Sequence, residues 1–406
     1  MGALSHIRVL DLTRVLAGPW CAQTLADFGA DVIKVERPGA GDDTRHWGPP
    51  YLQTPAGEDT AEAAYYLSAN RNKRSVTVDI ATPEGQRIVR ELAAQSDVVM
   101  ENYKVGQLKK YGLDYASLKA VKPDLVYCSV TGFGQTGPYA QRAGYDFIIQ
   151  GIGGFMSITG ERDALPGGGP QKAGVAIADL MTGMYSTVAI LSALAHRDRT
   201  GEGQYIDMAL LDVQVAMLAN MNTNYLASGK APVRQGNAHQ NIVPYQTFQT
   251  SDSWIIVAVG NDGQYRKFVE AGGRPEFADD ERFATNPARV RNREALVPLL
   301  AEMVRKRSKA EWIAALEASG VPCGPINDLA EVFDNEQVIA RGLQVNLPHP
   351  SGGTVKLVRN PINMSATPPE ALRHPPTLGE HTAEILRDVL GYDDAQIAAL
   401  RAKVVI

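Results

Sequence analysis

One carboxylate in this sequence stands in apolar surroundings that could give it chemistry to do. The residues close to Asp179 are apolar: Val175, Ile177, Leu180, Met181 and Met184. Desolvating an ionised carboxylate is costly unless the group is paired or takes part in a reaction. A structural role is also open, because Asp179 directly precedes an expected helix over 180–196 and could be its N-cap. The two roles are compatible, since a helix N-terminus stabilises a negative charge.

Two sequence blocks around this carboxylate resemble a known family. Gly-Tyr-Asp-Phe at 144–147 is followed by Ala-Asp-Leu-Met-Thr-Gly at 178–183. Together they resemble the class III CoA-transferase family, which includes formyl-CoA and carnitine CoA-transferases and the α-methylacyl-CoA racemases. The resemblance extends over essentially the whole chain. It implies that Asp179 is the catalytic carboxylate, and that CoA moves from an acyl-CoA to a small carboxylic acid through an aspartyl-CoA thioester.

Bulk properties exclude several other classes of protein. The chain has 406 residues and a net charge of −5, with 44% hydrophobic and 21% charged residues. Such a chain is expected to form two globular domains, and its acidic charge argues against nucleic acid as the main partner. We expect a cytoplasmic protein without membrane contact, because no signal peptide is visible and no apolar run approaches the roughly 20 residues of a membrane helix. Cys21, Cys128 and Cys323 lack the spacing of a metal site, so no metal is expected.

The order of the expected elements predicts an α/β fold with a doubly wound parallel, Rossmann-like large domain. Strands over 7–12 and 31–36 enclose a helix that starts near Pro19, which makes a βαβ unit. Further strands are expected over 76–80, 98–101 and 125–130.

A change of architecture predicts a second domain. After an expected helix over 211–226, an antiparallel pair of strands is predicted over 243–248 and 254–259. We therefore predict three segments, namely the large domain over 1–224, a smaller α+β domain over 225–337, and a return to the large domain over 338–406. The resemblance implies an interlocked homodimer.

A dinucleotide-binding fingerprint occurs in the wrong context. Gly-Phe-Gly-Gln-Thr-Gly at 132–137 has the required glycine spacing, yet Pro138 and a polar stretch follow where an apolar helix is required. The turn after the first strand, Thr-Arg-Val-Leu-Ala-Gly-Pro at 13–19, lacks the glycine triplet. The sequence therefore predicts a tight glycine loop at 132–137 and no NAD site.

The resemblance implies CoA contacts at particular residues. Val15, Leu16 and Ala17 occupy the first turn, and Arg37 is the matching basic residue after the second strand. Three further family motifs supply the remaining contacts: Asn72, Lys73, Asn102, Tyr103 and Lys110. A basic run such as 70–75 is also typical of a solvated loop, so its contact with the CoA phosphates is one of two interpretations.

A glycine-rich loop and a set of polar residues are the candidates for the rest of the active site. The loop consists of Gly260, Asn261, Asp262 and Gly263. Backbone N–H groups in such a loop can stabilise an oxyanion, and the resemblance implies a lid over the active site, in the same chain or in its partner. An ordinary turn is the alternative.

The active-site pocket is expected to contain Tyr145, Asp146, Gln150 and His239, and Tyr145 and Asp146 could shape the part that holds the thioester. The group that meets the acceptor's distal carboxylate is open among five residues: Arg45, His46, Gln150, Arg234 and His239. Gly-Asp-Asp-Thr-Arg at 41–45 looks like family members that act on small dicarboxylates such as oxalate, succinate or glutarate.

Two other functions remain open. A 2-methylacyl-CoA racemase or epimerase needs an acid/base pair, and that branch resembles Gly-His-Asp where this chain has Tyr145 before Asp146. Because an unperturbed tyrosine has a pKa of about 10, this difference favours transfer. A non-catalytic CoA-binding protein of the same fold would be expected to lack the aspartate at 179.

Overall fold

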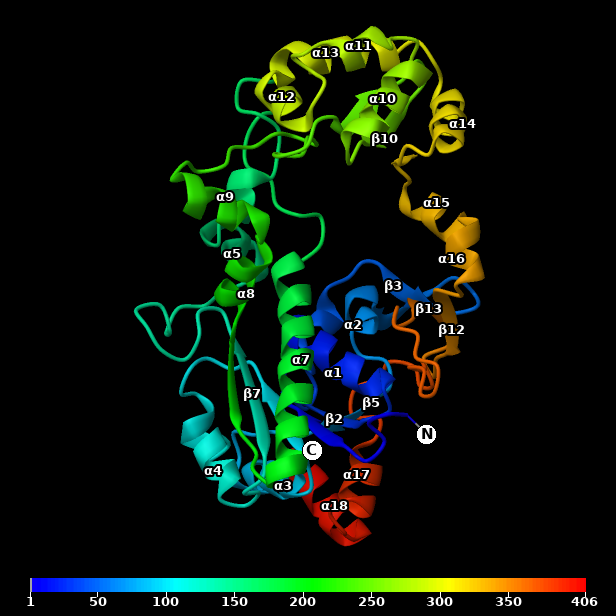
Figure 1. Cartoon of the computed structure of the whole chain (residues 1–406). Helices are drawn as coiled ribbons and strands as arrows, with labels where there is room; N and C mark the ends of the chain where they lie inside the picture. Colours follow the sequence, from blue (N-terminus) through cyan, green and yellow to red (C-terminus); the bar gives the residue numbers. More distant parts are fainter. Residues whose placement is uncertain (1) are drawn as a thin grey trace. The chain divides into compact units, whose positions relative to one another are not determined.

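The computed structural model describes residues 2–406, which divide into two compact units (Figure 1). The first unit contains the residues up to 154, 174–219 and 336–406, and the second contains 155–173 and 220–335. The sequence prediction gave residues 155–173 to the large domain, whereas this segment lies in the second compact unit. This loop is bound within the second unit, where the Gly236 N–H donates to the Gly160 carbonyl at 3.1 Å and Arg234 Nε donates to the Glu161 carbonyl at 3.3 Å.

A six-stranded parallel sheet forms the centre of the first unit. In spatial order its strands are β5 (Lys73–Thr77), β2 (Asp31–Glu36), β1 (Arg8–Asp11), β6 (Val98–Glu101), β7 (Val126–Thr131) and β8 (Tyr205–Ala209). Every neighbouring pair is parallel. The chain moves outward from β1 through β2 and β5 on one side, and through β6, β7 and β8 on the other. The predicted doubly wound α/β fold is therefore confirmed.

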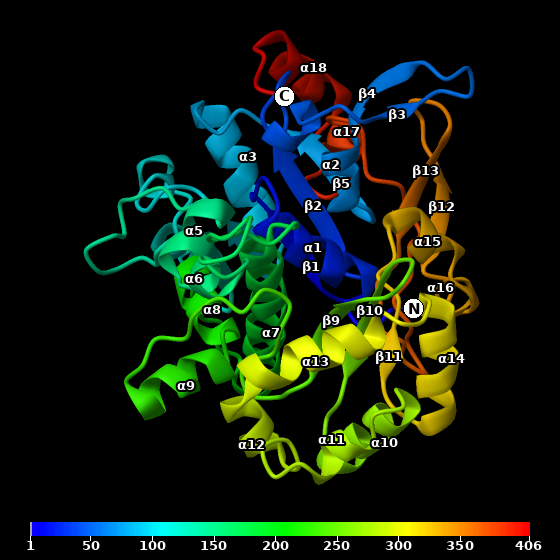
Figure 2. The same ribbon diagram turned by 90° about the horizontal axis from the view of Figure 1, so that it is seen from above.

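Helices cover both faces of this sheet (Figure 2). One face carries α1 (Ala17–Asp27), α5 (Asp146–Ile152) and α7 (Ile177–Thr200). The other carries α3 (Pro83–Ala94), α4 (Tyr115–Lys119), α17 (Thr382–Asp388) and α18 (Asp394–Ala402). Successive strand residues point to opposite faces, so Val9 enters one core and Leu10 the other. Strands that are apolar on both faces are typical of a parallel sheet covered by helices.

A glycine allows α7 to approach α1 closely. A Cβ atom at Gly183 would lie 2.7 Å from the Ala17 carbonyl oxygen and 3.1 Å from the Trp20 side chain. Gly183 follows Asp179 by four residues and therefore lies on the same helix face. The close approach thus brings the first turn of α7 to the N-terminus of α1.

The strand β5 begins at Lys73, three residues before the predicted strand. Lys73 is fully buried, and its Nζ donates to Asp11 Oδ2 at 3.0 Å, Asn70 Oδ1 at 2.9 Å and the Pro19 carbonyl at 3.0 Å. A buried ammonium group is tolerated when it is paired and fully hydrogen-bonded. A solvated loop and a CoA contact were the two interpretations of the basic run, and neither anticipates this buried strand start, because the ionic partner lies 62 residues away in sequence.

The second unit is built around a three-stranded antiparallel sheet. Its strands are β11 (Cys323–Gly324), β10 (Trp254–Ala258) and β9 (Tyr245–Gln249), and the predicted hairpin is confirmed. The helices packed around the buried Phe248, Phe268 and Trp312 include α10 (Asp262–Ala271), α13 (Arg293–Val304) and α14 (Lys309–Ser319).

The predicted helix over 211–226 is instead two helices, α8 (Leu210–Met217) in the first unit and α9 (Asn220–Ser228) in the second, because Ala219 between them has a φ of 45°.

Short elements complete both units. In the first unit they are the 3₁₀ helices Asp43–His46 and Leu108–Tyr111, β3 (Tyr51–Gln53), β4 (Asp59–Ala63), α2 (Ala64–Ser68), α16 (Glu336–Ala340), β12 (Gln344–Pro348) and β13 (Thr354–Val358). In the second unit they are α6 (Phe155–Ile158), α11 (Glu276–Asp279), α12 (Asn286–Arg291) and α15 (Leu329–Asp334).

The helix α7 corrects the expectation that no apolar run has membrane length. It has 24 residues, and its most apolar 18-residue window has a mean hydropathy of 1.4. By length and composition alone it could cross a membrane, a test that the core helix of a soluble protein also passes. In the structure 44% of that window is buried, and the helix packs on α1 and β7.

Candidate active site

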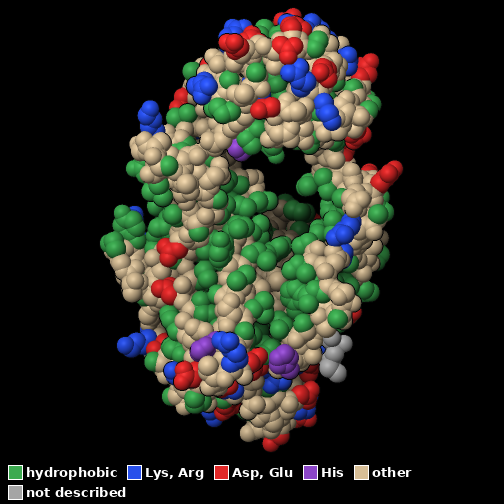
Figure 3. All heavy atoms as spheres, in the orientation of Figure 1, with side chains coloured by type: hydrophobic (Ala, Val, Ile, Leu, Met, Phe, Trp, Pro, Cys, Tyr) green, Lys and Arg blue, Asp and Glu red, His purple; other side chains and the backbone are tan. Residues whose placement is uncertain are grey.

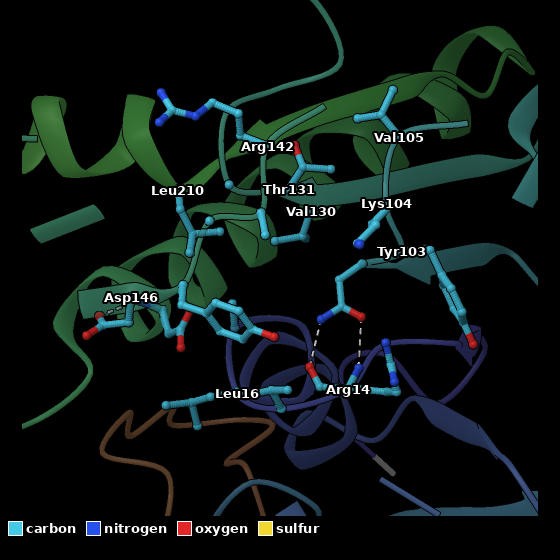
Figure 4. A pocket seen from close by; sticks show the side chains of 18 of the residues that line it. Arg14, Leu16, Tyr103, Lys104, Val105, Val130, Thr131, Arg142, Asp146 and Leu210 are labelled. Carbon is cyan, nitrogen blue, oxygen red and sulfur yellow. Dashed lines mark hydrogen bonds between the residues drawn. The ribbon is translucent and has the colours of Figure 1, made fainter. Parts of the chain in front are cut away.

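The loops that follow β1, β6 and β7 enclose a pocket that contains Asp179 (Figure 4). β1 and β6 are neighbours, but the chain leaves them toward opposite edges of the sheet. Ligands of open α/β sheets bind at such a switch point, beyond the carboxyl ends of the strands. The lining residues come from the β1 loop (14–17), the β6 loop (102–105) and the end of β7 with the loop after it (130–132 and 140–146).

Buried charges hold the β1 loop in a strained conformation. Val15 has a φ of 74°, which is rare for a β-branched residue. Its N–H donates to Asp42 Oδ1 at 3.2 Å, while Lys34 Nζ donates to Asp42 Oδ2 and to the Thr13 carbonyl, both at 2.9 Å. Burial raises the pKa of Asp42, but Lys34 and the hydrogen bonds from Thr44 outweigh this effect and hold the pKa at about 2. The ionised Asp42 therefore fixes the backbone that lines the pocket.

Asn102 joins the β6 loop to the β1 loop. Its Oδ1 accepts from the Arg14 N–H at 3.0 Å, and its Nδ2 donates to the Arg14 carbonyl at 2.7 Å (dashed lines beside Arg14 in Figure 4). The Arg14 guanidinium lies 5.4 Å from the centre of the Tyr103 ring and 3.2 Å from an Asp43 carboxylate oxygen. The two sides of the switch point are therefore joined by side chains of the pocket itself.

Asp179 lies in the first turn of α7, but a different residue caps that helix. The N-cap of α7 is Ala176, whose side chain makes no cap hydrogen bond. Asp146 Oδ1 instead accepts from the N–H groups of Ala178 at 2.8 Å and Asp179 at 3.4 Å. The N-cap interpretation of Asp179 is therefore wrong. Within residues 2–406 its carboxylate has no hydrogen-bond or ion-pair partner.

The surroundings of Asp179 favour its neutral form more than water does. The residue is half-buried. Burial, together with the nearby Asp146 carboxylate, raises the pKa of Asp179 to about 7. A carboxylate with such a pKa is more basic and more nucleophilic than an ordinary aspartate, yet a large part of it is ionised near neutral pH.

Three basic side chains line the same pocket: Arg14, Lys104 and Arg142. The Arg142 guanidinium lies 4.5 Å from the centre of the Tyr139 ring and extends away from Asp146 in Figure 4. Sequence reasoning missed all three residues. Arg14 stands inside the turn that was predicted to contact CoA, and Lys104 directly follows Tyr103, so both could have been found by extending those motifs by one residue.

A second pocket adjoins the first and reaches Arg37. The two pockets share Arg14, Asp43, Tyr103 and Gln107, and the second continues to residues 79–81. Most of the predicted CoA residues line one or both of them: Val15, Leu16, Ala17, Asn102, Tyr103 and Arg37. These pockets form a continuous lining suited to an elongated ligand.

Three other predicted CoA residues line neither pocket. Lys73 is buried in its ion pair with Asp11. Asn72 Nδ2 donates to Asp27 Oδ1 at 2.8 Å, and its Oδ1 accepts from the N–H groups of Leu372 and Arg373 at 2.8 and 2.9 Å. The side chains of Lys73 and Asn72 therefore stabilise the fold by bonding to distant parts of the chain. Lys110 is exposed, with its Nζ 6.0 Å from the Tyr111 ring centre.

The predicted acceptor residues of the first unit differ in access. Tyr145 is 64% exposed and lines the pocket with Asp146. Gln150 is fully buried, and its Nε2 donates to Asp146 Oδ2 at 2.7 Å. This hydrogen bond orients the Asp146 carboxylate. Arg45 is also buried, and its Nε and Nη2 each donate to a Glu36 carboxylate oxygen at 2.8 Å. His46 is bonded through Nε2 to the Ala40 carbonyl at 3.0 Å.

The remaining acceptor candidates belong to the second unit. His239 Nδ1 accepts from the Asn241 N–H at 3.0 Å, and the residue lines a separate pocket with Gln235 and Gln240. Arg234 forms an ion pair with Asp163.

The glycine-rich loop 260–263 also belongs to the second unit, where it starts α10. Asn261 is the N-cap, accepting from the Gln264 N–H at 2.9 Å, and the Gly260 N–H donates to Gln264 Oε1 at 2.7 Å. Asp262 is paired at 2.8 Å with Arg289, a fully buried residue. The loop is therefore a well-anchored helix start.

Features of other cofactor sites are few in the described part of the chain. After the glycine loop at 132–137 the next helix, α5, begins only at Asp146, so the predicted loop lacks the helix that a dinucleotide site requires. Across residues 2–406 no group of three or more His, Cys, Asp or Glu side chains could hold a metal ion.

Known proteins resemble this chain over nearly its whole length. The model of CoA-transferase family III matches residues 4–382. A succinate–glutarate CoA-transferase of Agrobacterium fabrum is 55% identical over 386 residues, which are 95% of each chain. The human succinyl-CoA:glutarate CoA-transferase is 45% identical over 397 residues, or 98% of this chain and 88% of the human protein.

Solved structures agree with the sequence relatives. A CaiB/BaiF family protein from Brucella suis is 54% identical, with a TM-score of 0.83 over 96% of this chain and 99% of that one. A second structure, Rv3272 of Mycobacterium tuberculosis, is 29% identical with a TM-score of 0.81 over 94% of this chain and 98% of that one. With the site geometry above, these matches show that the chain belongs to the family III CoA-transferases and is an enzyme of that class.

Proposed function

We propose that this enzyme moves CoA from a dicarboxylic acyl-CoA, such as succinyl-CoA, to a small dicarboxylic acid such as glutarate, with Asp179 as the covalent carrier. The observation that carries the proposal is the Asp179 carboxylate, which lines the switch-point pocket without a partner among residues 2–406 and has a pKa raised to about 7. The acid class is supported by the names of the relatives, which act on succinate and glutarate.

The proposed reaction consists of balanced acyl transfers. An Asp179 oxygen attacks the donor thioester carbonyl, the C–S bond breaks, and CoA leaves as a thiolate. The donor acyl group is then joined to Asp179 as a mixed anhydride. The thiolate then attacks the aspartyl carbonyl, which releases the donor acid as a carboxylate and leaves an aspartyl-CoA thioester. The acceptor carboxylate repeats the two steps in reverse and regenerates Asp179. No net proton transfer is required.

The chain supplies three features that this relay needs. Partial burial makes the Asp179 carboxylate a stronger nucleophile. Asp146 accepts hydrogen bonds from the Ala178 and Asp179 N–H groups in the first turn of α7. The Asp179 carboxylate therefore does not cap the helix and lines the pocket. Arg14 and Lys104 on the pocket wall offer positive charge to the anionic substrates.

We place CoA along the two adjoining pockets. Val15, Leu16 and Ala17 would contact the part of CoA near the thioester, and Arg37 in the second pocket would meet its phosphates. Binding energy from this remote part of CoA can position the reacting thioester. Asn72, Lys73 and Lys110 do not enter this proposal.

We also propose that the chain acts as a homodimer in the cytoplasm, with the loop 260–263 as a lid. The dimer is supported by exposed apolar side chains in the first unit, on α5 and α7: Phe147, Ile148, Ile152, Tyr185 and Val188. Apolar side chains gather over α7 and α8 on the face drawn in Figure 3. Contiguous exposed apolar surface is typical of a protein interface.

The experiment is an acyl-exchange assay with succinyl-CoA and a panel of acids: glutarate, succinate, oxalate and acetate. We expect glutaryl-CoA to form, acetate to be a poor acceptor, and Asp179→Ala to be inactive although it still binds CoA. Exchange with acetate but not with any dicarboxylate would overturn the acid class. α-Proton exchange in a 2-methylacyl-CoA without any acyl exchange would replace the proposal by racemisation, and CoA binding without either reaction would leave a binding protein.

A further inference from the structure

A buried carboxylate outside the catalytic pocket lies where two pocket loops meet. Glu101 ends β6 and is 6% exposed. Its Oε2 accepts from the Tyr103 N–H at 2.7 Å, and its Oε1 accepts a short hydrogen bond from the Ser129 hydroxyl on β7. The proposed mechanism does not use Glu101, so its burial needs another explanation.

The first of these hydrogen bonds acts on the β6 loop. It fixes the backbone at Tyr103, which follows Asn102 directly. Asn102 in turn is paired in both directions with the Arg14 backbone, and the Arg14 guanidinium lies over the Tyr103 ring. A short series of contacts therefore connects Glu101 to Arg14, which lines both pockets.

The second hydrogen bond acts on the glycine loop 132–137. Gln135 Nε2 donates to the Ser129 hydroxyl oxygen at 2.8 Å, so the hydroxyl proton is left for Glu101. The Gln135 N–H donates to Asp207 on β8 at 3.0 Å, which fixes the loop from its other side. Gly132 at the start of this loop and residues 140–146 after it line the catalytic pocket, so the position of the loop affects the pocket wall. The glycine motif is thus part of the pocket wall, and it need not bind a dinucleotide.

We infer that Glu101 is a positioning residue, whose ionised carboxylate holds the β6 loop and the glycine loop in the form that binds CoA. The inference rests on the proposed CoA site. Hydrogen bonds to an ionised acceptor are stronger than those to a neutral one. Loss of the charge on Glu101 therefore loosens both loops and weakens CoA binding without altering the carboxylate of Asp179.

The charge of Glu101 is poised to change near neutral pH. Burial raises its pKa to about 7, against the hydrogen bonds from Ser129 and the Tyr103 N–H, which lower it. The ionisable groups around it come from the segment between β6 and α4, from α4, and from β7 and β8: Tyr103, Lys104, Lys109, Asp114, Tyr115, Tyr127, Cys128 and Tyr205. CoA should accordingly bind more tightly at pH 8 than at pH 6.

The test is titration calorimetry of CoA at pH 6, 7 and 8 with the full chain and two variants. Glu101→Gln keeps the shape and an acceptor for the Tyr103 N–H but is never charged. We expect it to bind CoA about tenfold more weakly than the wild type at pH 8 and equally at pH 6. Ser129→Ala keeps the carboxylate and its bond to Tyr103 but removes the connection to the glycine loop. At pH 8 it should weaken CoA binding less than Glu101→Gln does, and the midpoint of the pH dependence should move upward, because a hydrogen bond that lowers the pKa of Glu101 is lost.

The outcomes separate this inference from the proposed function. Glu101→Gln with wild-type affinity at pH 8 and an unchanged melting temperature would overturn the positioning role. A lower melting temperature without any change in CoA affinity would show a purely structural role and overturn it too. A wild-type protein that binds no CoA at any pH would contradict the CoA site itself, and with it the proposed function.

Discussion

Two aspartates at the N-terminus of α7 have different roles, one as a helix cap and one as a pocket carboxylate. Asp146 accepts the first N–H groups of the helix, and Asp179 lines the pocket without a partner among residues 2–406. A single aspartate could not do both, because a carboxylate that caps its own helix is stabilised as an anion and becomes a weaker nucleophile. This division explains why a reactive carboxylate can stand at a position that resembles an N-cap.

Replacing Asp179 by asparagine should abolish transfer. The variant should also gain stability relative to the wild-type protein as the pH rises. The folded pKa of about 7 lies above that of an unfolded aspartate, about 3.9. The stability contributed by the protonated group is therefore complete below pH 4 and is lost as the pH rises through 7. The melting temperature of Asp179→Asn, relative to the wild type, should increase by a few degrees between pH 5 and pH 8. A difference that stays constant over this range would contradict the raised pKa.

Asp146→Asn tests the coupling between the two carboxylates. The amide oxygen can still accept from the Ala178 N–H, but the negative charge that helps raise the pKa of Asp179 is gone. The rising limb of the pH–rate profile should move to lower pH, and the maximal rate should fall because Asp179 becomes less nucleophilic. An unchanged midpoint in the profile of kcat against pH would show that Asp146 acts only as a cap.

The sequence revealed Asp179 because its local surroundings are apolar, a signal within a few residues. It did not reveal the cap or the buried Lys73, since their partners are distant along the chain: Asp146 lies 32 residues from Ala178, and Asp11 lies 62 residues from Lys73. Contacts with such distant partners cannot be read from local sequence patterns.

At the scale of elements, the close packing of α7 on α1 determines where the catalytic turn lies. The predicted order of strands and helices was sufficient for the doubly wound sheet, because alternating periodicity is a local property. The start of β5 and the division of the helix 211–226 were wrong, because buried ion pairs and a positive φ at Ala219 decided them.

Gly183→Ala should lower the melting temperature, although alanine is the better helix former by about 1 kcal/mol. The new methyl group would lie 2.7 Å from the Ala17 carbonyl oxygen, so α1 and the β1 loop must move. Transfer activity should fall at temperatures where the variant remains folded, as circular dichroism can verify. Ser192→Ala, an exposed position on the same helix, is the matched control and should leave both quantities nearly unchanged. A stabilised Gly183→Ala would contradict the tight contact.

At the scale of the whole molecule, the exposed apolar side chains of the first unit predict a dimer. Val188 on α7 is 60% exposed, and Val188→Asp should shift the protein from dimer to monomer in analytical ultracentrifugation. Leu372→Asp changes a residue that is 72% exposed outside α5 and α7 and should remain dimeric. A wild-type monomer at micromolar concentration would contradict the prediction. Sequence pattern alone could not give the assembly, which came from the family resemblance.

Whether Asp179 carries CoA covalently is decided by intact-mass spectrometry after incubation with succinyl-CoA. We expect a mass increase equal to CoA less one water on the wild-type chain, its disappearance when glutarate is added, and no adduct on Asp179→Ala. A CoA adduct that persists on Asp179→Ala, or rapid formation of glutaryl-CoA by a variant without this carboxylate, would contradict this covalent role.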